Sequence, residues 1–386
     1  MNGGLVRVST TEDDLLVSSQ RGGTSKDLWI LGKEDLNINF TKIFENSKYS
    51  YTSINNLSTL KAENLFWLGR YLARFITTTR FIMHIVKKLT NFYRYEGVAS
   101  KESQKILHKA LTQLTMTYPG FFNEENKKKL SKNPMLEIVS VVKDSSRQGS
   151  LSFTFLMLSN TSINLKDILA IESAKLYDKM KEEWSSFSKK TTYSNISMAK
   201  ELDKMLVYMI AYKELVKESI YKEQGLILYD IGYKIESALL LISKARSIMC
   251  LHVEKSVEYD ILEGLLNSLE SFNAYRAKYK SSLLLENVIE FLILNKQFPK
   301  SLSYITEELL QELRLLPKSK DELTSYEKPM AEANELLTSI NIESIMQINE
   351  GEVIYFEFDK ILSQLSQLYI ECSNEFSKTY FSHYDE

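Results

Sequence analysis

One helical stretch carries most of the side chains that could take part in chemistry. Within residues 58–86, which contain no proline, Glu63, Trp67, Arg70 and Arg74 recur at spacings of three or four and therefore share one face of a helix. A carboxylate, an indole and two guanidiniums on one line could bind an anion or a peptide. The same side chains could also form a buried structural network, or a solvated face with weak ion pairs.

The other side of this stretch is apolar and predicts a helix that packs on a core, with Leu65, Leu68, Leu72 and Phe75 in register. Only 13 glycines and 5 prolines occur in 386 residues, which favours long helices over many strands and turns. Further helices are expected at residues 101–117, 135–143, 151–158, 165–188, 198–222, 225–252, 257–280, 284–294, 300–315, 330–339 and 356–381.

Two sequence segments recur later in the chain with many substitutions. The run LFWLGRYL around Gly69 returns as LYDIGYKI around Gly232, at an offset of 163 (232 minus 69). A second echo relates Ser150 to Ser301, at an offset of 151 (301 minus 150). Two similar offsets in the same order indicate a duplicated helical unit.

We therefore predict an all-α fold of two pseudo-repeated antiparallel helical-bundle halves, at about residues 58–222 and 223–386, with a small β-containing segment at the N-terminus. A glycine inside a helix costs about 1 kcal/mol relative to alanine. Gly69 and Gly232 should therefore lie at helix crossings, where close contact of two backbones requires them.

The N-terminal 57 residues differ from the rest of the chain in their sequence pattern. Residues 1–35 predict short strands, and residues 36–57 are polar and predict a linker to the helical domain at residues 58–386. A polar loop between the strands could wrap backbone N–H groups around a phosphate or dock onto another domain, or be a plain hairpin loop. It does not match the P-loop pattern. Its candidate residues are Ser18, Ser19, Gln20, Gly22, Gly23, Ser25, Lys26 and Asp27.

Composition argues against several classes of function. The chain has 48 basic and 50 acidic side chains, so no overall field would attract nucleic acid or an acidic membrane. Cys250 and Cys372 cannot build a disulfide framework, and the four histidines lack ligand spacing, so no metal site is expected. No apolar run is long enough to span a bilayer and no signal segment is evident, which makes a cytoplasmic location the default.

A family resemblance takes the interpretation further. Residues 58–74, STLKAENLFWLGRYLAR, resemble the opening of the bacterial alpha-E domain family, approximately S-R-x-A-E-N-L-Y-W-L-G-R-Y-x-E-R. Residues 266–279 and the segment FLILNKQFPKSL at residues 291–302 are similar to later parts of that family. The resemblance runs from residue 58 almost to the end of the chain.

Several charged positions of the family pattern are changed here. Ala73 stands at the second glutamate of the opening motif, and ITTTR replaces E-N-T-A-R but keeps Arg80. The second-half segment that resembles G-R-F-x-E-R keeps Gly232 and Glu236. If the family uses these charges as a site, that site is depleted in this chain. The candidate anion- or peptide-binding residues are Glu63, Asn64, Trp67, Arg70, Arg74, Arg80 and Glu236.

The N-terminal segment carries a second resemblance. Residues 3–8 and 17–31 are similar to the closing segment of circularly permuted ATP-grasp proteins, with G-G-L-x-R-V and S-S-Q-G-G-G-S-K-D-x-W-V-L. This implies ATP-dependent carboxylate–amine ligation, in gene neighbourhoods with transglutaminase-like and proteasome-like peptidases. Only the tail of a ligase is present, so ATP and magnesium are expected only through a ligase partner.

Three functions remain open. The first is a non-catalytic partner or accessory subunit of an ATP-grasp peptide ligase. The second is the C-terminal part of an ATP-grasp and alpha-E ligase, in which Glu63, Arg70 and Arg80 would contribute to amide-bond chemistry. The third is a structural interaction module. We do not expect this chain alone to ligate substrates, and no nucleic-acid or membrane partner is expected.

Overall fold

The computed structural model divides the chain into two compact units, Met1–Asn56 and Leu57–Glu386. It describes residues 2–8, 24–30, 57–92, 98–220, 225–317, 322–348 and 351–381. In the first unit, strands β1 (Asn2–Val8) and β2 (Thr24–Ile30) pair antiparallel, with Gly4 opposite Leu28. The short strand expected near residue 16 lies outside the described residues.

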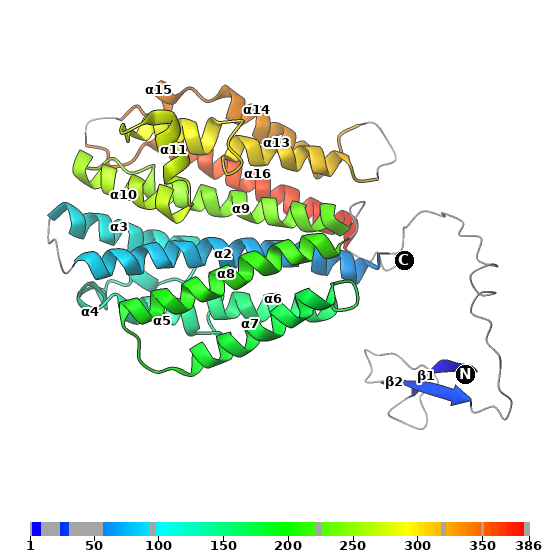
Figure 1. Cartoon of the computed structure of the whole chain (residues 1–386). Coiled ribbons are helices and arrows are strands. Elements are labelled where there is room, and N and C mark those ends of the chain that lie inside the picture. Colours follow the sequence, from blue (N-terminus) through cyan, green and yellow to red (C-terminus); the bar gives the residue numbers. More distant parts are fainter. Residues whose placement is uncertain are drawn as a thin grey trace. The chain divides into compact units, whose positions relative to one another are not determined.

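The second unit is helical, as the sequence predicts (Figure 1). Its longer helices are α2 (Thr59–Phe92), α3 (Val98–Thr115), α5 (Met135–Lys143), α6 (Leu151–Asn164), α7 (Ile171–Lys189), α8 (Asn195–Ser219), α9 (Ile227–Ile248), α10 (Lys255–Ser268), α11 (Phe272–Tyr279), α13 (Leu302–Arg314), α14 (Glu327–Ser339) and α16 (Phe356–Tyr380). Shorter turns are η2 (Gly120–Phe122), α4 (Lys127–Lys132), α12 (Leu285–Ile289), the π-helical η4 (Glu290–Leu294) and α15 (Ile342–Ile345).

One expected helix is wrong. The continuous helix predicted for residues 257–280 is broken into α10 and α11, because the chain turns between them. Glu270 has φ 51°, in the left-handed region, and the Ser271 N–H donates to the Leu266 carbonyl at 2.9 Å. Such a turn ends a helix by closing its last carbonyls.

Helices α2 and α9 form the centre of the helical unit and cross in direct backbone contact (Figure 1). A Cβ built on Gly69 would lie 2.2 Å from the Tyr229 carbonyl oxygen, and one built on Gly232 would lie 2.1 Å from the Phe66 carbonyl oxygen. Side chains essentially never approach backbone so closely, so both positions require glycine. The predicted placement of the two glycines at a helix crossing is confirmed.

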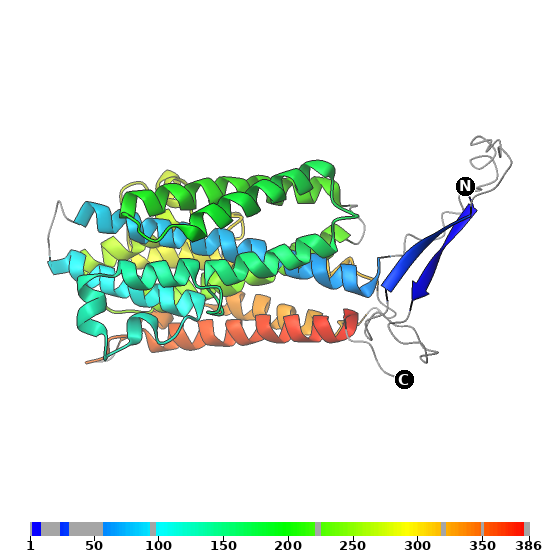
Figure 2. The same cartoon turned by 90° about the horizontal axis from the view of Figure 1, so that it is seen from below.

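Most of the longer helices run roughly along one common direction (Figure 2). Helices α6 and α8 contact α2, with α7 on α8; helices α13 and α16 contact α9, with α14 lying on both. Helices α3 and α10 contact each other, and α3 also packs on α9 while α10 packs on α2. The two central helices therefore have matching sets of neighbours.

Two serines begin helices α6 and α13 in the same way. The Ser150 Oγ accepts from the Phe153 N–H at 3.0 Å at the start of α6, and the Ser301 Oγ accepts from the Tyr304 N–H at 3.2 Å at the start of α13. Each hydroxyl also donates to the carbonyl six residues before it. Both serines are thus N-caps that also fix the incoming loop.

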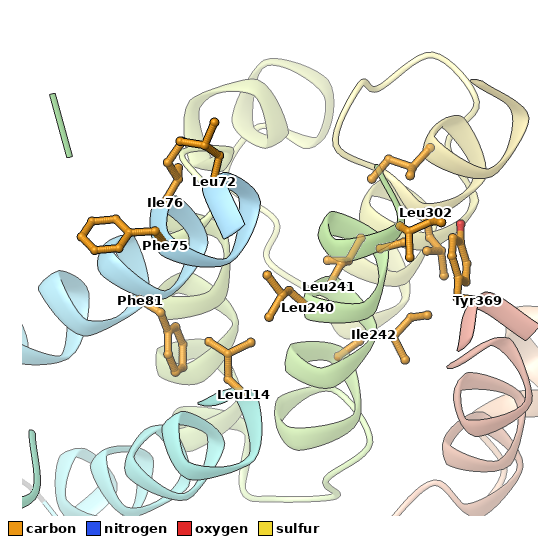
Figure 3. Close-up of a cluster of buried hydrophobic side chains, with 14 of the residues drawn as sticks. Leu72, Phe75, Ile76, Phe81, Leu114, Leu240, Leu241, Ile242, Leu302 and Tyr369 are labelled. Atoms are coloured by element: carbon orange, nitrogen blue, oxygen red, sulfur yellow. The ribbon is translucent and has the colours of Figure 1, made fainter. Parts of the chain in front are cut away.

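The core surrounds α2 on more than one side. Leu65, Leu68, Leu72 and Phe75 are fully buried, as predicted, but Phe66 is fully buried as well. Figure 3 shows side chains of α2, α3, α9, α13 and α16 gathered in one buried cluster. A helix in this central position has little exposed surface, so its polar residues must find partners inside the protein.

Candidate functional site

The polar face of α2 meets a buried carboxylate of α9. Glu236, whose side chain is only 4% exposed, accepts at Oε2 from the Arg70 Nε at 2.9 Å and at Oε1 from the Arg74 Nε at 2.7 Å. Arg70 and Arg74 lie one helical turn apart, so a single carboxylate can bridge them. We call these three residues the Glu236 network.

Aromatic side chains and a third helix complete the surroundings. The Arg70 guanidinium lies 4.9 Å from the centre of the Trp67 ring and donates to the Ser373 Oγ of α16 at 3.0 Å. Trp67 stacks on Tyr71, with ring centroids 5.5 Å apart, and the Arg74 guanidinium lies 5.9 Å from the Tyr71 ring centre. The network therefore ties α2, α9 and α16 together.

The electrostatics keep the network ionised. Burial alone would raise the pKa of Glu236, but the charges and hydrogen bonds of Arg74 and Arg70 outweigh it and hold that pKa below its usual range. Burial lowers the pKa of Arg74, and Glu236 more than offsets this. Burial also raises the pKa of the Tyr71 hydroxyl. Both oxygens of Glu236 are occupied, and the carboxylate carries no proton to give at neutral pH.

The other candidates of the first turns of α2 lie apart from this network. The Asn64 Nδ2 donates to the Leu60 carbonyl at 2.7 Å, and its Oδ1 accepts from the Asn164 Nδ2 of α6 at 3.2 Å. Glu63 is half-buried and forms no ion pair with any residue that the structure describes. Asn64 therefore links α2 to α6, whereas Glu63 has no comparable partner there.

Arg80 lies further along α2 and is also separate from the Glu236 network. Its Nε is buried and has no hydrogen-bond partner within the described ranges. It is close enough to Lys244 of α9 and to Lys300, before α13, to lower the pKa of each. We call Arg80, Lys244 and Lys300 the Arg80 cluster.

Sequence reasoning missed part of both groups. Tyr71 and Ser373 around the network, and the two lysines of the Arg80 cluster, were not among the candidates. Lys244 had a detectable signal, because it follows directly on the apolar run at residues 238–242 and one serine, within a helical stretch. The others depend on contacts between helices far apart in the chain.

The N-terminal candidates are only partly described. Ser25, Lys26 and Asp27 lie on β2, where Asp27 pairs with Leu5 and Lys26 with Val6 of β1. Ser18, Ser19, Gln20, Gly22 and Gly23 lie outside the described residues. The proposed docking or phosphate role of this segment therefore stays a prediction.

Two features are absent from the described ranges. No group of three or more histidine, cysteine, aspartate or glutamate side chains is placed to hold a metal ion in the part of the chain that the structure describes. Among the same residues, no helix combines the length and the apolar character needed to cross a membrane.

One comparison with known proteins identifies a family. The alpha-E family, described as "a predicted alpha-helical domain with a conserved ER motif", matches residues 57–381. Uncharacterised proteins of Mycobacterium bovis and Mycobacterium tuberculosis are each 24% identical over 267 residues, which is 66% of this chain but only 30% of each relative. No solved structure matches. The chain belongs to the alpha-E family.

Proposed function

We propose that this chain is a non-catalytic partner of a circularly permuted ATP-grasp ligase that joins a carboxylate to an amine. One observation carries this proposal: Glu236, the carboxylate of α9 that meets the polar face of α2, is buried, and its two oxygens accept from Arg70 and Arg74. An acid or base must reach the proton that it transfers. Glu236, Arg70 and Arg74, which the sequence marked as candidates, instead join helices α9 and α2.

The N-terminal segment supplies the link to a ligase. Its resemblance to the closing part of circularly permuted ATP-grasp proteins gives it a role in docking on, or completing, the ligase domain. ATP and magnesium would bind to that partner. The chain spans only 30% of the length of its mycobacterial relatives, which leaves room in them for a further domain. We place the system in the bacterial cytoplasm, where ATP is available.

The helical domain itself is, in this proposal, a duplicated unit. The matching neighbours of α2 and α9, the reciprocal contacts of Gly69 and Gly232, and the equivalent caps at Ser150 and Ser301 support this. The offset of 163 aligns Ala73 with Glu236 (73 plus 163) and Arg74 with Ser237 (74 plus 163).

The duplication also bears on the ER motif of the family. The chain contains no adjacent glutamate and arginine in that order. Instead, the second half supplies Glu236 and the first half supplies Arg74, and the two meet across the crossing at 2.7 Å. We infer that each half keeps one member of the motif, so that a salt bridge between the halves survives.

Reconstitution tests the proposed partnership. The chain is co-expressed with the circularly permuted ATP-grasp protein of the same genome, the complex is measured by size-exclusion chromatography with light scattering, and ADP formation is followed with carboxylate and amine substrates. We expect a complex that is weakened by the double change Lys26→Ala and Asp27→Ala. The matched control, Lys128→Met on the exposed surface of α4, should bind as the wild type does.

Three results would contradict the proposal. ADP formation and amide products from the chain alone would favour the enzymatic alternative, in which the helical domain contributes to amide-bond chemistry. A complex with a transglutaminase-like or proteasome-like peptidase from the same neighbourhood, but not with the ligase, would make the chain an interaction module of another assembly. If the double variant binds the ligase as tightly as the wild type does, the N-terminal segment is not part of the interface.

A further inference from the structure

A cavity of about 260 Å³ lies between α2, α8, α9, the end of α10 and the start of α13. Its lining combines cations with hydroxyl groups, among them Arg80, Lys300, Ser237, Ser268 and Tyr304. A water molecule needs only about 10–15 Å³ of such space. The cavity can therefore hold a polyatomic anion together with a small group bonded to it.

The cations in this region fall into two sets. Lys217 and Lys234, which also line the cavity, are neutralised: Lys217 pairs with Asp230 at 2.7 Å, and Lys234 pairs with Glu312. No carboxylate of the described residues forms an ion pair with any member of the Arg80 cluster. Their positive charges are therefore left without a counter-ion in this part of the protein.

The Arg80 cluster is also poor in hydrogen-bond acceptors. The Arg80 Nε has none among the described residues. Among the residues that the structure describes, the fully buried Lys244 Nζ reaches one acceptor, the Ser268 Oγ, at 3.4 Å, and it lies 5.0 Å from the Phe81 ring centre. Lys300 donates to the backbone carbonyls of Leu269 and Glu270, at 2.6 and 3.2 Å.

The pKa values record the same excess of positive charge. Burial, followed by the charges of Arg80 and Lys300, lowers the pKa of Lys244 to about 7. Burial and Arg80 also lower the pKa of Lys300; Lys213 adds to this effect and Glu270 offsets it only in part. Buried charges without partners are costly, and a bound anion would remove that cost.

We propose that this cavity binds the phosphate group of a small phosphorylated molecule, with Arg80 and Lys300 as the principal ligands. A guanidinium and an ammonium together suit a phosphate, which takes parallel N–H donors from arginine and a point charge from lysine. The Tyr304 hydroxyl, which also lines the cavity, can donate to a remaining oxygen, whereas the hydroxyls of Ser237 and Ser268 already donate to the carbonyls of Tyr233 and Leu265. The site does not depend on the ligase partner.

A phosphate matches the cluster better than a carboxylate does. A phosphate monoester carries about −1.5 to −2 charge at neutral pH and three acceptor oxygens. A carboxylate brings one charge and two oxygens, which would leave most of the positive charge of the cluster uncompensated. Asp230, the acidic residue of the lining, is already paired with Lys217 and therefore repels an incoming anion less.

Calorimetric titration of the full-length protein with inorganic phosphate tests the proposal. Sodium chloride keeps the ionic strength constant, and methyl phosphate and acetate are titrated in parallel. We expect binding of both phosphates and none of acetate at the same concentration. Because an anion raises the pKa of Lys244, binding at pH 7.5, chosen to lie about half a unit above that pKa, should take up protons, which appears as a dependence of the heat on the buffer.

Variants locate the site. Arg80→Gln should weaken phosphate binding by about ten- to hundredfold, because a charged hydrogen-bonding group is lost. Lys300→Met should weaken it as well, which guards against a folding defect in one variant. Arg314→Gln, the same substitution at an exposed position of α13, should leave binding unchanged. Absence of phosphate binding by the wild type, equal binding by Arg80→Gln, or tighter binding of acetate would each overturn the proposal.

Discussion

Helix α2 contributes cations to two groups that differ in how their charge is balanced. In the Glu236 network, Arg70 and Arg74 share a carboxylate that lies 2.9 and 2.7 Å away. In the Arg80 cluster, six residues further along the same helix, no carboxylate of the described ranges pairs with the cations. A balanced group holds helices together, whereas an unbalanced one, two of whose members line a cavity, has unused binding capacity.

The proposed duplication relates the two groups. Ser237 occupies in the second half the position of Arg74 in the first, and Ser237 lines the cavity. Ala73, aligned with Glu236, is fully buried and carries no charge. Under the proposed duplication, the glutamate of one half and the arginine of the other join α9 to α2, and the remaining arginine position holds Ser237 at the cavity. The difference teaches that the same pair of helices carries a balanced charge network and, beside it, a cavity lined by unpaired cations.

The largest loss of stability is expected from a substitution in the Glu236 network. Glu236→Ala should lower the free energy of unfolding by about 3–5 kcal/mol, because it leaves two partly buried guanidiniums without a counter-ion. Urea denaturation measures this. Since the pKa of Glu236 is below its usual value, its contribution is complete above about pH 4.3, the ordinary glutamate value, and is lost as the pH falls through the folded-state pKa.

Glu63→Ala is the matched control for that substitution. Glu63 lies on the same face of α2 but outside the network, so its removal should change the free energy of unfolding by less than about 0.5 kcal/mol. Equal losses for the two variants would mean that the network has no special structural role.

The glycine crossing sets the separation of the helices that carry both groups. Gly69→Ala and Gly232→Ala should each cost about 1–3 kcal/mol or more, because the added Cβ overlaps backbone atoms. Gly264→Ala is the comparison, since its Cβ would meet the His84 ring at 2.9 Å, and a side chain can move. In thermal unfolding, Gly264→Ala should lower the melting temperature least of the three variants. A milder effect at Gly69 would contradict the close crossing.

A substitution of Lys244, the buried lysine of the Arg80 cluster, should stabilise the protein and not destabilise it. Lys244→Met should raise the free energy of unfolding by about 1–2 kcal/mol at pH 6 in phosphate-free buffer, because an unpaired buried charge is replaced by an apolar chain of similar length. Urea denaturation of the two proteins measures it. Lys128→Met, on the exposed surface, should have no such effect.

The pH dependence of that gain follows from the pKa of Lys244, which is lowered from 10.5 to about 7. Below pH 7 the lysine is protonated in both states, so the destabilisation of the wild type is complete. Between pH 7 and 10.5 the unfolded state binds more protons, so the wild type gains stability as the pH rises. The advantage of Lys244→Met should therefore shrink over that interval; an advantage that grows would contradict the burial of a charged lysine.

Local sequence patterns were enough to predict much of the fold. The helical class, the apolar register of α2 and the role of Gly69 and Gly232 followed from periodicity and from the cost of glycine in a helix, and all three are confirmed. The break at Glu270 was missed because neither glycine nor proline marks it. A left-handed residue without such a marker depends on the tertiary structure around it.

The site was less predictable. The spacing of Arg70 and Arg74 marked one face of a helix, but their partner Glu236 is 166 and 162 residues away in the chain. Spacing along one helix also cannot tell a solvated face from a face buried at the centre of a bundle. Lys300 was missed for a related reason: it lies in a connection between helices, and only the packing of α13 brings it beside Arg80.

The most direct test compares two arginines of α2 in one experiment. The free energies of unfolding of the wild type, Arg74→Gln and Arg80→Gln are measured in urea, with and without inorganic phosphate at constant ionic strength. We predict that Arg74→Gln is destabilised without phosphate yet keeps the stabilisation by phosphate, and that Arg80→Gln is as stable as the wild type without phosphate but loses that stabilisation. Destabilisation of Arg80→Gln alone, with the phosphate effect intact, would contradict the division of α2 into a structural network and a binding site.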